Sequence, residues 1–384
     1  MPKITELDNL VDRLPDDTKD IFNNLLFKKT DKGKRMVPPA FYERFWRYFR
    51  EGDETREQTI ERASEQTVVR TFNRYTLQGA LFNELRTSKP GSRVDEREKY
   101  RKDVIAGVHK AHEDKEYGDN CEKDEGCDFC HPEKYTTKDS EERIEKNGHV
   151  TAINAAGYNS NNGMIIFRNW NPLKFTLQNF SDWIGLASEW FKKKRAEDVA
   201  LEYPFLMWNC LEKSGASQIH GHMHMLIESG MAYDDVERLR DASERYRQGG
   251  RNFFKDLSRV HKELGLGFEY NGADVFASLT PKKDKETLVV SNTLEGLVEP
   301  LFKVLRCFID KMDVFAFNMV VQMPALTEKK GWQDFPYIGR VVDRGNPLKI
   351  GSDFAGMEIY GTPVIGSDSY RVVEELIRYM KKNA

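Results

Sequence analysis

The sequence predicts an α/β (α+β) protein with two related halves, each combining a sheet with helices, and with a helical N-terminal extension. The chain has 384 residues, 39% of them hydrophobic, which is enough for more than one domain-sized core. The first 100 or so residues are highly charged, with apolar side chains at helical spacing. After residue 150, apolar runs typical of strands alternate with amphipathic helices, and the same order occurs twice.

Composition and charge exclude several classes of protein. The 59 basic and 62 acidic side chains give a net charge of −3, unlike proteins that coat nucleic acid. No apolar run approaches the roughly 18–20 residues of a membrane span, and the N-terminus lacks a secretory signal. Five cysteines do not suggest a disulfide framework. We therefore expect a cytoplasmic protein without nucleic-acid or membrane partners.

The N-terminal third is expected to be mainly helical. Phe41, Phe45 and Phe49 recur at about one helical turn, which predicts a packed amphipathic helix. Residues 94–145 are rich in charge and hold a cluster of cysteines, so we expect a long surface loop with some helix there.

The first half has a strand–helix–strand–loop–strand order. The predicted elements are a strand at 163–168, a helix over 180–195, a strand at 204–209, a loop at 214–217 and a strand at 218–227. The helix shows apolar residues at i, i+3, i+4 and i+7, and its four basic residues at 192–195 suit a helix C-terminus.

The second half repeats this order. Its predicted elements are strands at 287–291, 314–321, 338–342 and 357–360, with a long amphipathic helix over 294–309. An exposed charged helix is expected between the halves, over 234–265. Asn209 and Asn318 each follow an aromatic strand. Internal duplication explains this recurrence, and it divides the chain into residues 1–100, 101–230 and 231–384.

The strongest signal in the chain is a histidine triplet. His220, His222 and His224 occupy alternate positions of one predicted strand, so their side chains share one face. Two chemistries fit such a face: imidazole ligands to a metal such as zinc, or an imidazole nucleophile that attacks phosphorus while its neighbours orient it.

The loop before the triplet favours the nucleophile. Residues 214–218 are small or polar and offer hydroxyls and free backbone N–H groups, the donors that phosphate oxygens need. The candidate substrate-binding residues in this loop are Gly215, Ala216, Ser217 and Gln218.

This pattern resembles the histidine-triad (HIT) superfamily. It is carried by Asn209, Gly215, Ser217 and the alternating histidines. The length, the repeated unit and an upstream Cys-x-x-Cys motif are similar to the branch of galactose-1-phosphate uridylyltransferases and diadenosine tetraphosphate phosphorylases. The resemblance covers residues 125–228 well and 287–375 more weakly. It implies two HIT-like halves of antiparallel sheet plus helix. Members of the branch often dimerise, so it also implies a homodimer.

The resemblance also implies a reaction. His222 would be the nucleophile that takes a nucleoside monophosphate from a phosphoanhydride, and a phosphate, a sugar phosphate or water would then release it. Asn209 would fix the loop, Ser217 would bind the phosphate, and backbone donors at Gly215 and Ala216 would stabilise the transition state. The partners would be a small nucleotide substrate and a phosphate or sugar-phosphate acceptor.

One position departs from the branch. His224 stands where the transferases usually have glutamine, and a histidine there can protonate a leaving group, as hydrolases require. Two alternatives therefore accompany the nucleotidyltransferase or phosphorylase: a nucleotide hydrolase that uses the same residues, and a zinc-stabilised nucleotide-binding protein without turnover.

A structural zinc site is expected upstream. Cys127 and Cys130 have the spacing of two ligands of one zinc ion, although they could also be free thiols. In the resembling uridylyltransferases the first histidine of the triad is another ligand, which matches His220. Their remaining ligand corresponds to Asn171, a poor zinc ligand. The alternatives for this fourth position are Cys121, His131 and His149.

Two arginines complete the candidates. Arg86 lies where family members carry basic residues near the substrate phosphates. Arg340 could meet the phosphate of an acceptor, with a surface salt bridge as the alternative. It belongs to a strand of the second half, Ile338-Gly339-Arg340, that lacks the histidines, so a single active site is expected.

Overall fold

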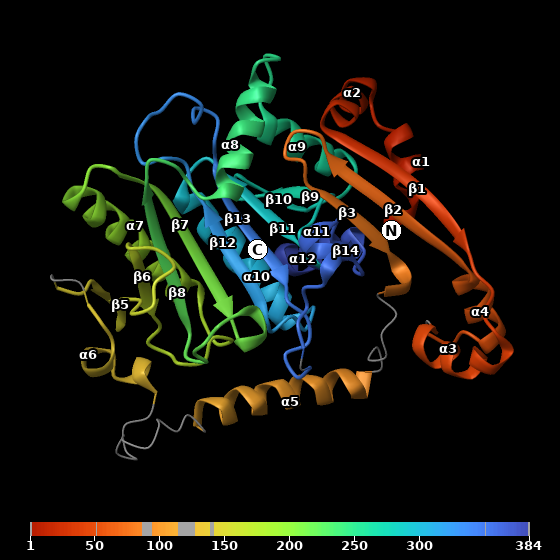
Figure 1. Cartoon of the computed structure of the whole chain (residues 1–384), viewed down its shortest axis with the longest axis horizontal. Helices are drawn as coiled ribbons and strands as arrows, with labels where there is room; N and C mark the ends of the chain where they lie inside the picture. Colours follow the sequence, from red (N-terminus) through yellow and green to blue (C-terminus); the bar gives the residue numbers. More distant parts are fainter. Residues whose placement is uncertain are drawn as a thin grey trace.

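A computed structural model describes residues 2–50, 52–86, 94–113, 127–138, 142–349 and 351–382. Two sheets organise the chain (Figure 1): one of ten strands, in the order β4-β5-β6-β8-β7-β12-β13-β11-β10-β9, and one of four, in the order β1-β2-β3-β14.

Each half of the chain contributes five strands to the larger sheet. The first five are β4 (Glu145–Lys146), β5 (His149–Ile153), β6 (Asn162–Ile166), β7 (Leu201–Cys210) and β8 (His222–Ser229). The second five are β9 (Gly267–Tyr270), β10 (Ala273–Ala277), β11 (Thr287–Ser291), β12 (Phe317–Gln322) and β13 (Tyr337–Asp343). Both sets have the same spatial order, and they join where β7 pairs antiparallel with β12.

One long helix follows the third strand of each set. These helices, α7 (Leu177–Glu197) and α10 (Leu294–Asp310), begin at threonine N-caps and bury their apolar faces in one core with the sheet. The C-terminal helix α12 (Ser369–Lys382) packs in the same core. The two halves therefore share one topology, as internal duplication would produce, and the predicted α+β class is confirmed.

The N-terminal third differs from its prediction. It contains η1 (Ile4–Glu6), α1 (Leu7–Asp12), α2 (Asp16–Leu25), η2 (Pro39–Phe41), α3 (Tyr42–Phe49), α4 (Arg56–Ser64) and η3 (Glu84–Arg86), but also β1 (Leu26–Lys34), β2 (Glu65–Asn73) and β3 (Gly79–Asn83). The expected helices are therefore present, but the prediction missed the three strands that accompany them. Much of the β1–β2 ribbon is exposed, so its strands carry charged side chains and lack the apolar alternation that marks a half-buried strand.

Three further predictions need correction. A helix, α5 (Val94–Glu113), crosses the boundary expected at residue 100 and lies along the lower edge in Figure 1. The expected helix over 234–265 is two helices, α8 (Asp234–Arg247) and α9 (Phe253–Glu263), each with a buried apolar face. The strand expected at 357–360 is a short helix, α11 (Gly356–Tyr360), followed by β14 (Val364–Ile365).

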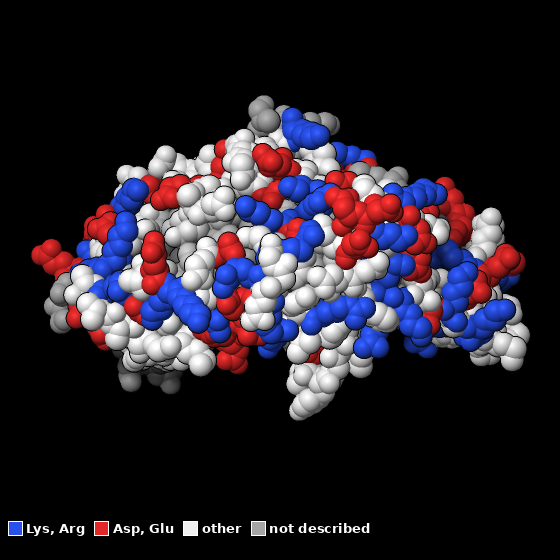
Figure 2. All heavy atoms as spheres, turned by 90° about the horizontal axis from the view of Figure 1, so that it is seen from above, with Lys and Arg blue, Asp and Glu red and all other residues white. Residues whose placement is uncertain are grey.

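The helices α8 and α9 and the N-terminal sheet share a second core on the other face of the second half. On the corresponding face of the first half lie η4 (Asp128–Cys130) and α6 (Pro132–Tyr135), near the histidines. Figure 2 shows acidic and basic side chains interspersed over the face seen from above. Of the helices in the described residues, none is long and apolar enough to cross a membrane.

Candidate active site and metal centre

The histidine triplet spans the beginning of β8. His222 and His224 lie on the strand, with ring centroids 5.2 Å apart, whereas His220 precedes it. The prediction that all three belong to the strand is therefore wrong for His220, which lies two positions before β8 begins. Gly221 permits this entry, because a Cβ there would lie 2.3 Å from the Cδ2 atom of Phe167.

The hydrogen bonding of His222 fixes its tautomer. Its Nδ1 lies 2.9 Å from the carbonyl oxygen of His220. A carbonyl can only accept, so Nδ1 carries a proton and donates, and in the neutral ring the lone pair lies on Nε2. The side chain is buried, and the ring of Phe129 packs edge-on at 5.1 Å. This is the arrangement that a nucleophilic imidazole needs.

His224 is neutral near pH 7. Burial, and next the neighbouring His222, lower its pKa to about 3. Its Nδ1 atom is buried and has no hydrogen-bond partner among the residues that the structure describes. The ring of Tyr158 lies 5.3 Å away.

A cavity of about 350 Å³ lies beside these rings. Its walls come from residues 128–137, from the segment between β5 and β6, and from the loop that precedes β8. Five predicted site residues line it: Gly215, Ser217, Gln218, His222 and His224. The Oε1 atom of Gln218 is buried and has no partner within the described chain. The cavity therefore places the buried imidazoles of His222 and His224 beside the polar side chains of Ser217 and Gln218.

The loop between β7 and the histidines has a strained, well-anchored backbone. It passes through η5 (Glu212–Ser214), flanked by Leu211 with φ 70° and Gly215 with φ 99°. The hydroxyl of Ser214 donates to the carbonyl of Cys210 over 2.7 Å. The amide of Asn318 donates both to the Ser214 carbonyl, over 2.9 Å, and to Oδ1 of Asn209, over 2.6 Å. Asn209 therefore reaches the loop through Asn318.

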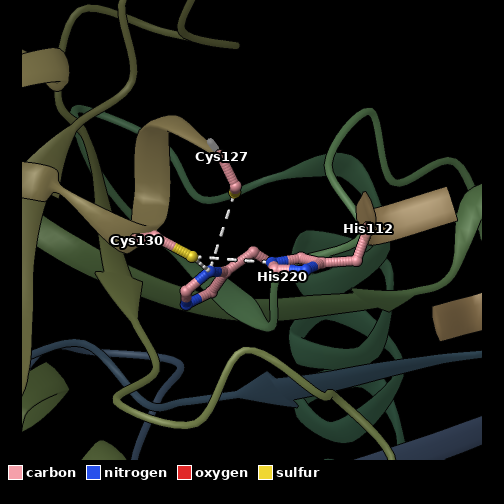
Figure 3. A group of neighbouring side chains, drawn as sticks. All are labelled: His112, Cys127, Cys130 and His220. Atoms are coloured by element: carbon pink, nitrogen blue, oxygen red, sulfur yellow. Dashed lines mark hydrogen bonds between the residues drawn. The ribbon is translucent and has the colours of Figure 1, made fainter. Parts of the chain in front are cut away.

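Four side chains form a cluster whose donor atoms all lie within 4.8 Å of one another: His112, Cys127, Cys130 and His220. They point toward a common centre in Figure 3. Nδ1 of His220 lies 3.7 Å from Sγ of Cys127 and 3.5 Å from Sγ of Cys130, and Nε2 of His112 lies 3.5 Å from the latter. Neighbouring ligands of a tetrahedral zinc ion are separated by about 3.5 Å.

The surroundings of this cluster suit a cation. Nε2 of His220 donates to the carbonyl of Phe167 over 2.7 Å, which leaves the Nδ1 lone pair directed at the sulfur atoms. Burial, and next the adjacent Cys127, raise the pKa of the Cys130 thiol above its ordinary value, so thiolates here need a positive charge. His112 stacks on Trp170 with ring centroids 4.1 Å apart. The cluster could hold a metal ion.

Comparisons with known proteins place this geometry in context. No protein-family model matches the sequence, and no curated protein does. An ADP-glucose phosphorylase from Arabidopsis thaliana, solved with bound ADP-glucose, is similar in structure with a TM-score of 0.56 and 12% identity, covering 79% of this chain and 95% of its own. A galactose-1-phosphate uridylyltransferase-like protein from the same plant has a TM-score of 0.53 and 13% identity, and the match covers 65% of this chain and 91% of that protein. A uridylyltransferase mutant has a TM-score of 0.53 and 13% identity, and the match covers 67% of this chain and 94% of that protein.

The chain has the histidine-triad fold. The predicted resemblance is thereby confirmed at the level of architecture.

Within this histidine-triad fold, the predicted metal ligands Cys127, Cys130 and His220 come together. The fourth member, His112, was missed, because it lies near the end of α5, upstream of the cysteines and apart from any motif. The alternatives do not join the cluster: His131 is exposed, and Nδ1 of His149 accepts from the indole of Trp183 over 3.1 Å. Cys121 lies outside the described residues, and Asn171 holds a loop through its own hydrogen bonds.

The two predicted arginines lie elsewhere in the histidine-triad fold. Arg86 ends a turn after β3, is exposed and does not line the histidine cavity. Arg340 forms the predicted kind of ion pair, but it is only 6% exposed, so the expectation that this pair lies at the surface is wrong. Its Nη2 donates to Glu286 over 2.8 Å and its Nη1 to Asp235 over 3.3 Å, a buried ion-pair network on β13. A buried charge requires such partners, and the sequence does not reveal them.

Proposed function

We propose that the chain is a nucleotidyltransferase or phosphorylase that forms a covalent nucleotidyl intermediate on His222. The observation that carries this proposal is the hydrogen bond from Nδ1 of His222 to the carbonyl of His220, which leaves Nε2 as a nucleophile in a buried polar cavity. The substrate would be a nucleotide-sugar or a dinucleoside polyphosphate. The similarity in fold to a uridylyltransferase and an ADP-glucose phosphorylase supports this class.

The first step would be attack of Nε2 on the α-phosphorus of the substrate. A P–N bond forms, and the P–O bond to the leaving phosphate breaks, with the electron pair leaving on that oxygen. The imidazole becomes cationic, and its Nδ1–H bond to the His220 carbonyl stabilises that charge. The Ser217 hydroxyl would hold a non-bridging oxygen, whereas the N–H groups of Gly215 and Ala216, to which the resemblance gives this task, already donate to the carbonyls of Glu212 and Leu211 over 2.8 and 3.3 Å.

The second step would reverse the first with another acceptor. An oxygen of phosphate or of a sugar phosphate attacks the same phosphorus, the P–N bond breaks, and the neutral imidazole is restored. Burial, and next His222, lower the pKa of His224 to about 3, so it would meet the leaving group as a neutral imidazole. Arg86 and Arg340 would lie outside the phosphate site.

We propose zinc for the metal centre, because two thiolates and two imidazoles form a set that zinc favours. When bound, the ion would neutralise both thiolates. Cys127, Cys130 and His112 would tie the end of α5 and the η4 turn to His220, directly before the strand that carries His222. The role of the site would be structural.

The experiment that tests the function is mass spectrometry of the intact protein after brief exposure to ADP-glucose or diadenosine tetraphosphate. The control is His109→Asn, which changes a histidine of α5 outside the metal cluster. We expect an increase equal to one adenylyl group on the wild type and on His109→Asn, and none on His222→Asn. Absence of the adduct on the wild type with both compounds, or an adduct that persists on His222→Asn, would refute the covalent mechanism.

A second measurement separates transfer from hydrolysis. With labelled inorganic phosphate present, a phosphorylase incorporates the label into ADP, and a hydrolase releases unlabelled AMP. AMP as the sole product, with phosphate and with glucose 1-phosphate, would establish the hydrolase. A non-catalytic nucleotide-binding protein would bind both compounds and convert neither.

A further inference from the structure

The ribbon formed by β1 and β2 ends in a small helical tip that the proposed reaction does not use. The strands pair antiparallel over 9 residues, and Figure 1 shows α3 and α4 at one end of the ribbon and α1 and α2 at the other. This tip, residues 35–64, holds η2, α3 and α4. Its Phe45 is buried outside the two large cores and contacts the rings of Phe41 and Phe49, with centroids 5.8 and 4.7 Å away. The tip therefore has a small core of its own.

An apolar run begins the tip. Six consecutive apolar residues, Met36-Val37-Pro38-Pro39-Ala40-Phe41, lead from β1 into α3. The side chain of Met36 is 97% exposed and that of Phe41 is 37% exposed, and only Val37 of the six is half-buried. A continuous run of exposed apolar side chains is unusual on a protein surface and marks a site of contact with a partner.

Cations flank the apolar run on both sides. Residues 26–50 hold eight basic and two acidic side chains, a net charge of +6, whereas the whole chain carries −3, so the rest of the chain carries −9. Within the residues that the structure describes, the side chains of Lys34, Arg35 and Arg44 form no ion pair and no hydrogen bond. The near-neutral net charge of the chain therefore hides a strongly basic segment.

The acidic side chains of the tip belong mainly to α4, and two of them are matched within it. Glu54 lies 2.7 Å from Arg62, and Glu57 lies 3.5 Å from Arg56. The uncompensated positive charge is therefore on the side of β1 and α3, next to the apolar run.

We propose that the tip docks on the surface of an anionic lipid bilayer, with residues 36–41 in the interface and the flanking cations against the headgroups. Removal of the apolar side chains from water and attraction of the cations to anionic lipid are the two signals that together give stable peripheral binding. Such a contact needs neither a membrane-spanning helix nor a positive net charge, the features on which the expectation of no membrane partner rested. The negative remainder of the molecule is repelled by the same surface, so the tip alone approaches it.

Nucleic acid is a poorer match for the same charges. The bases of a single strand stack on open aromatic faces, but here guanidinium groups occupy a face of each of three rings. Arg50 lies 4.9 Å over the ring of Trp46, and Arg44 lies over the rings of Phe41 and Tyr48 at 5.9 and 5.7 Å. The exposed run is mainly aliphatic, and aliphatic side chains gain from entry into lipid rather than from stacking.

Flotation with lipid vesicles tests this proposal, with the full chain and without substrate. Vesicles of phosphatidylcholine are compared with vesicles that also contain about one third phosphatidylserine. Met36→Asp puts a charge into the apolar run at a side chain whose 97% exposure leaves no packing to lose. Met231→Asp makes the same change at a methionine that is 67% exposed between β8 and α8, and is the matched control.

A second pair of variants tests the cations. Arg35→Gln removes one charge beside the apolar run, and Arg371→Gln removes one charge at an exposed position of α12. We expect the wild type to float with the anionic vesicles, to stay in solution with the neutral ones, and to detach as salt is added. Met36→Asp should weaken binding about tenfold or more and Arg35→Gln about fivefold, whereas each control should change it less than about twofold.

Three results would overturn the proposal: no binding of the wild type to anionic vesicles, equal binding to both kinds of vesicle, or equal losses in a variant and its control. Binding of a single-stranded RNA oligonucleotide in place of the vesicles would assign the tip to nucleic acid and overturn it as well. None of these measurements involves the chemistry of His222, so the proposed function and the membrane contact can fail separately.

Discussion

Asn318 on β12 donates a 2.6 Å hydrogen bond to Asn209 on β7, although the two residues are 109 positions apart in the sequence. They are also direct partners in the register of the β7–β12 pair, where the two halves join. The Asn318 amide and Nη1 of Arg344 both donate to the Ser214 carbonyl, over 2.9 and 3.2 Å. The half that lacks the histidine triplet therefore holds the loop that leads to the triplet.

Replacement of Asn318 by Ala should slow catalysis while preserving the fold. It removes two donated bonds, and we expect a loss of about 1–3 kcal/mol in transition-state stabilisation, a roughly 10- to 100-fold lower kcat/KM. Steady-state kinetics and a thermal melt check this. Asn23→Ala, at an exposed position on α2, is the control. Unchanged kinetics in a folded Asn318→Ala protein would contradict a role in positioning the loop.

The metal centre should depend on one of two neighbouring histidines. His112 and His109 both contact Trp170, with ring centroids 4.1 and 5.0 Å away, but only His112 belongs to the cluster. We expect His112→Ala to lower zinc affinity at least tenfold and His109→Ala to leave it unchanged. Elemental analysis after dialysis against a competing chelator measures this, and similar zinc retention in both variants would exclude His112 as a ligand.

The free energy of unfolding should fall at acidic pH, because two buried histidines have lowered pKa values. Burial lowers the pKa of His261 to about 4, and the hydrogen bond that its Nδ1 donates to the Leu257 carbonyl opposes this shift only in part. Its Nε2 accepts from the N–H of Leu279. His224 is shifted in the same direction, to about 3. Below pH 6.5 the unfolded chain binds protons that the folded chain refuses, so the free energy of unfolding falls as pH drops from about 6.5 towards 4.

Each of these histidines lowers the free energy of unfolding by at most about 1.4 kcal/mol per pH unit in that pH range. Denaturant unfolding of the wild type and of His261→Gln at pH 7.5 and 5.5 tests the effect. The variant is less stable throughout but should lose less stability between the two pH values. The same loss in both proteins would show that His261 does not titrate as its burial requires.

Gly221→Ala should damage both stability and activity. The added Cβ would lie 2.3 Å from the ring of Phe167, which stacks on Trp183 at 3.6 Å and cannot move freely. We expect a cost of about 1–3 kcal/mol and a displaced His222. Gly33→Ala, on an exposed strand where the new Cβ would touch only one atom at 4.0 Å, serves as the control. Equal melting temperatures for both variants would refute the steric argument.

The sequence was informative where function depends on local spacing. The Cys-x-x-Cys motif, the alternating histidines and the small residues of the 214–218 loop lie within short segments, and the structure brings His220 to both cysteines. His112 and the partners of Arg340 depend instead on contacts between distant segments. A single sequence carries no local signal for such contacts.

Part of the sheet topology could be predicted from the sequence for the same reason. Strands with buried apolar runs, such as β6 and β7, could be recognised from their pattern. The strands β1 and β2 could not, because an exposed ribbon tolerates charged side chains on both faces.

The pairing of β14 with β3 has a consequence for how the chain is made. Val364 and Ile365 complete the N-terminal sheet in parallel with Leu81 and Phe82, and Asp368 accepts from the backbone N–H of Ile4. During synthesis the first segments leave the ribosome with the edge of β3 unpaired, and its partner arrives nearly 300 residues later. The N-terminal sheet therefore cannot close until most of the chain has been made, and until then β3 presents an unpaired edge that is open to mispairing in the nascent chain.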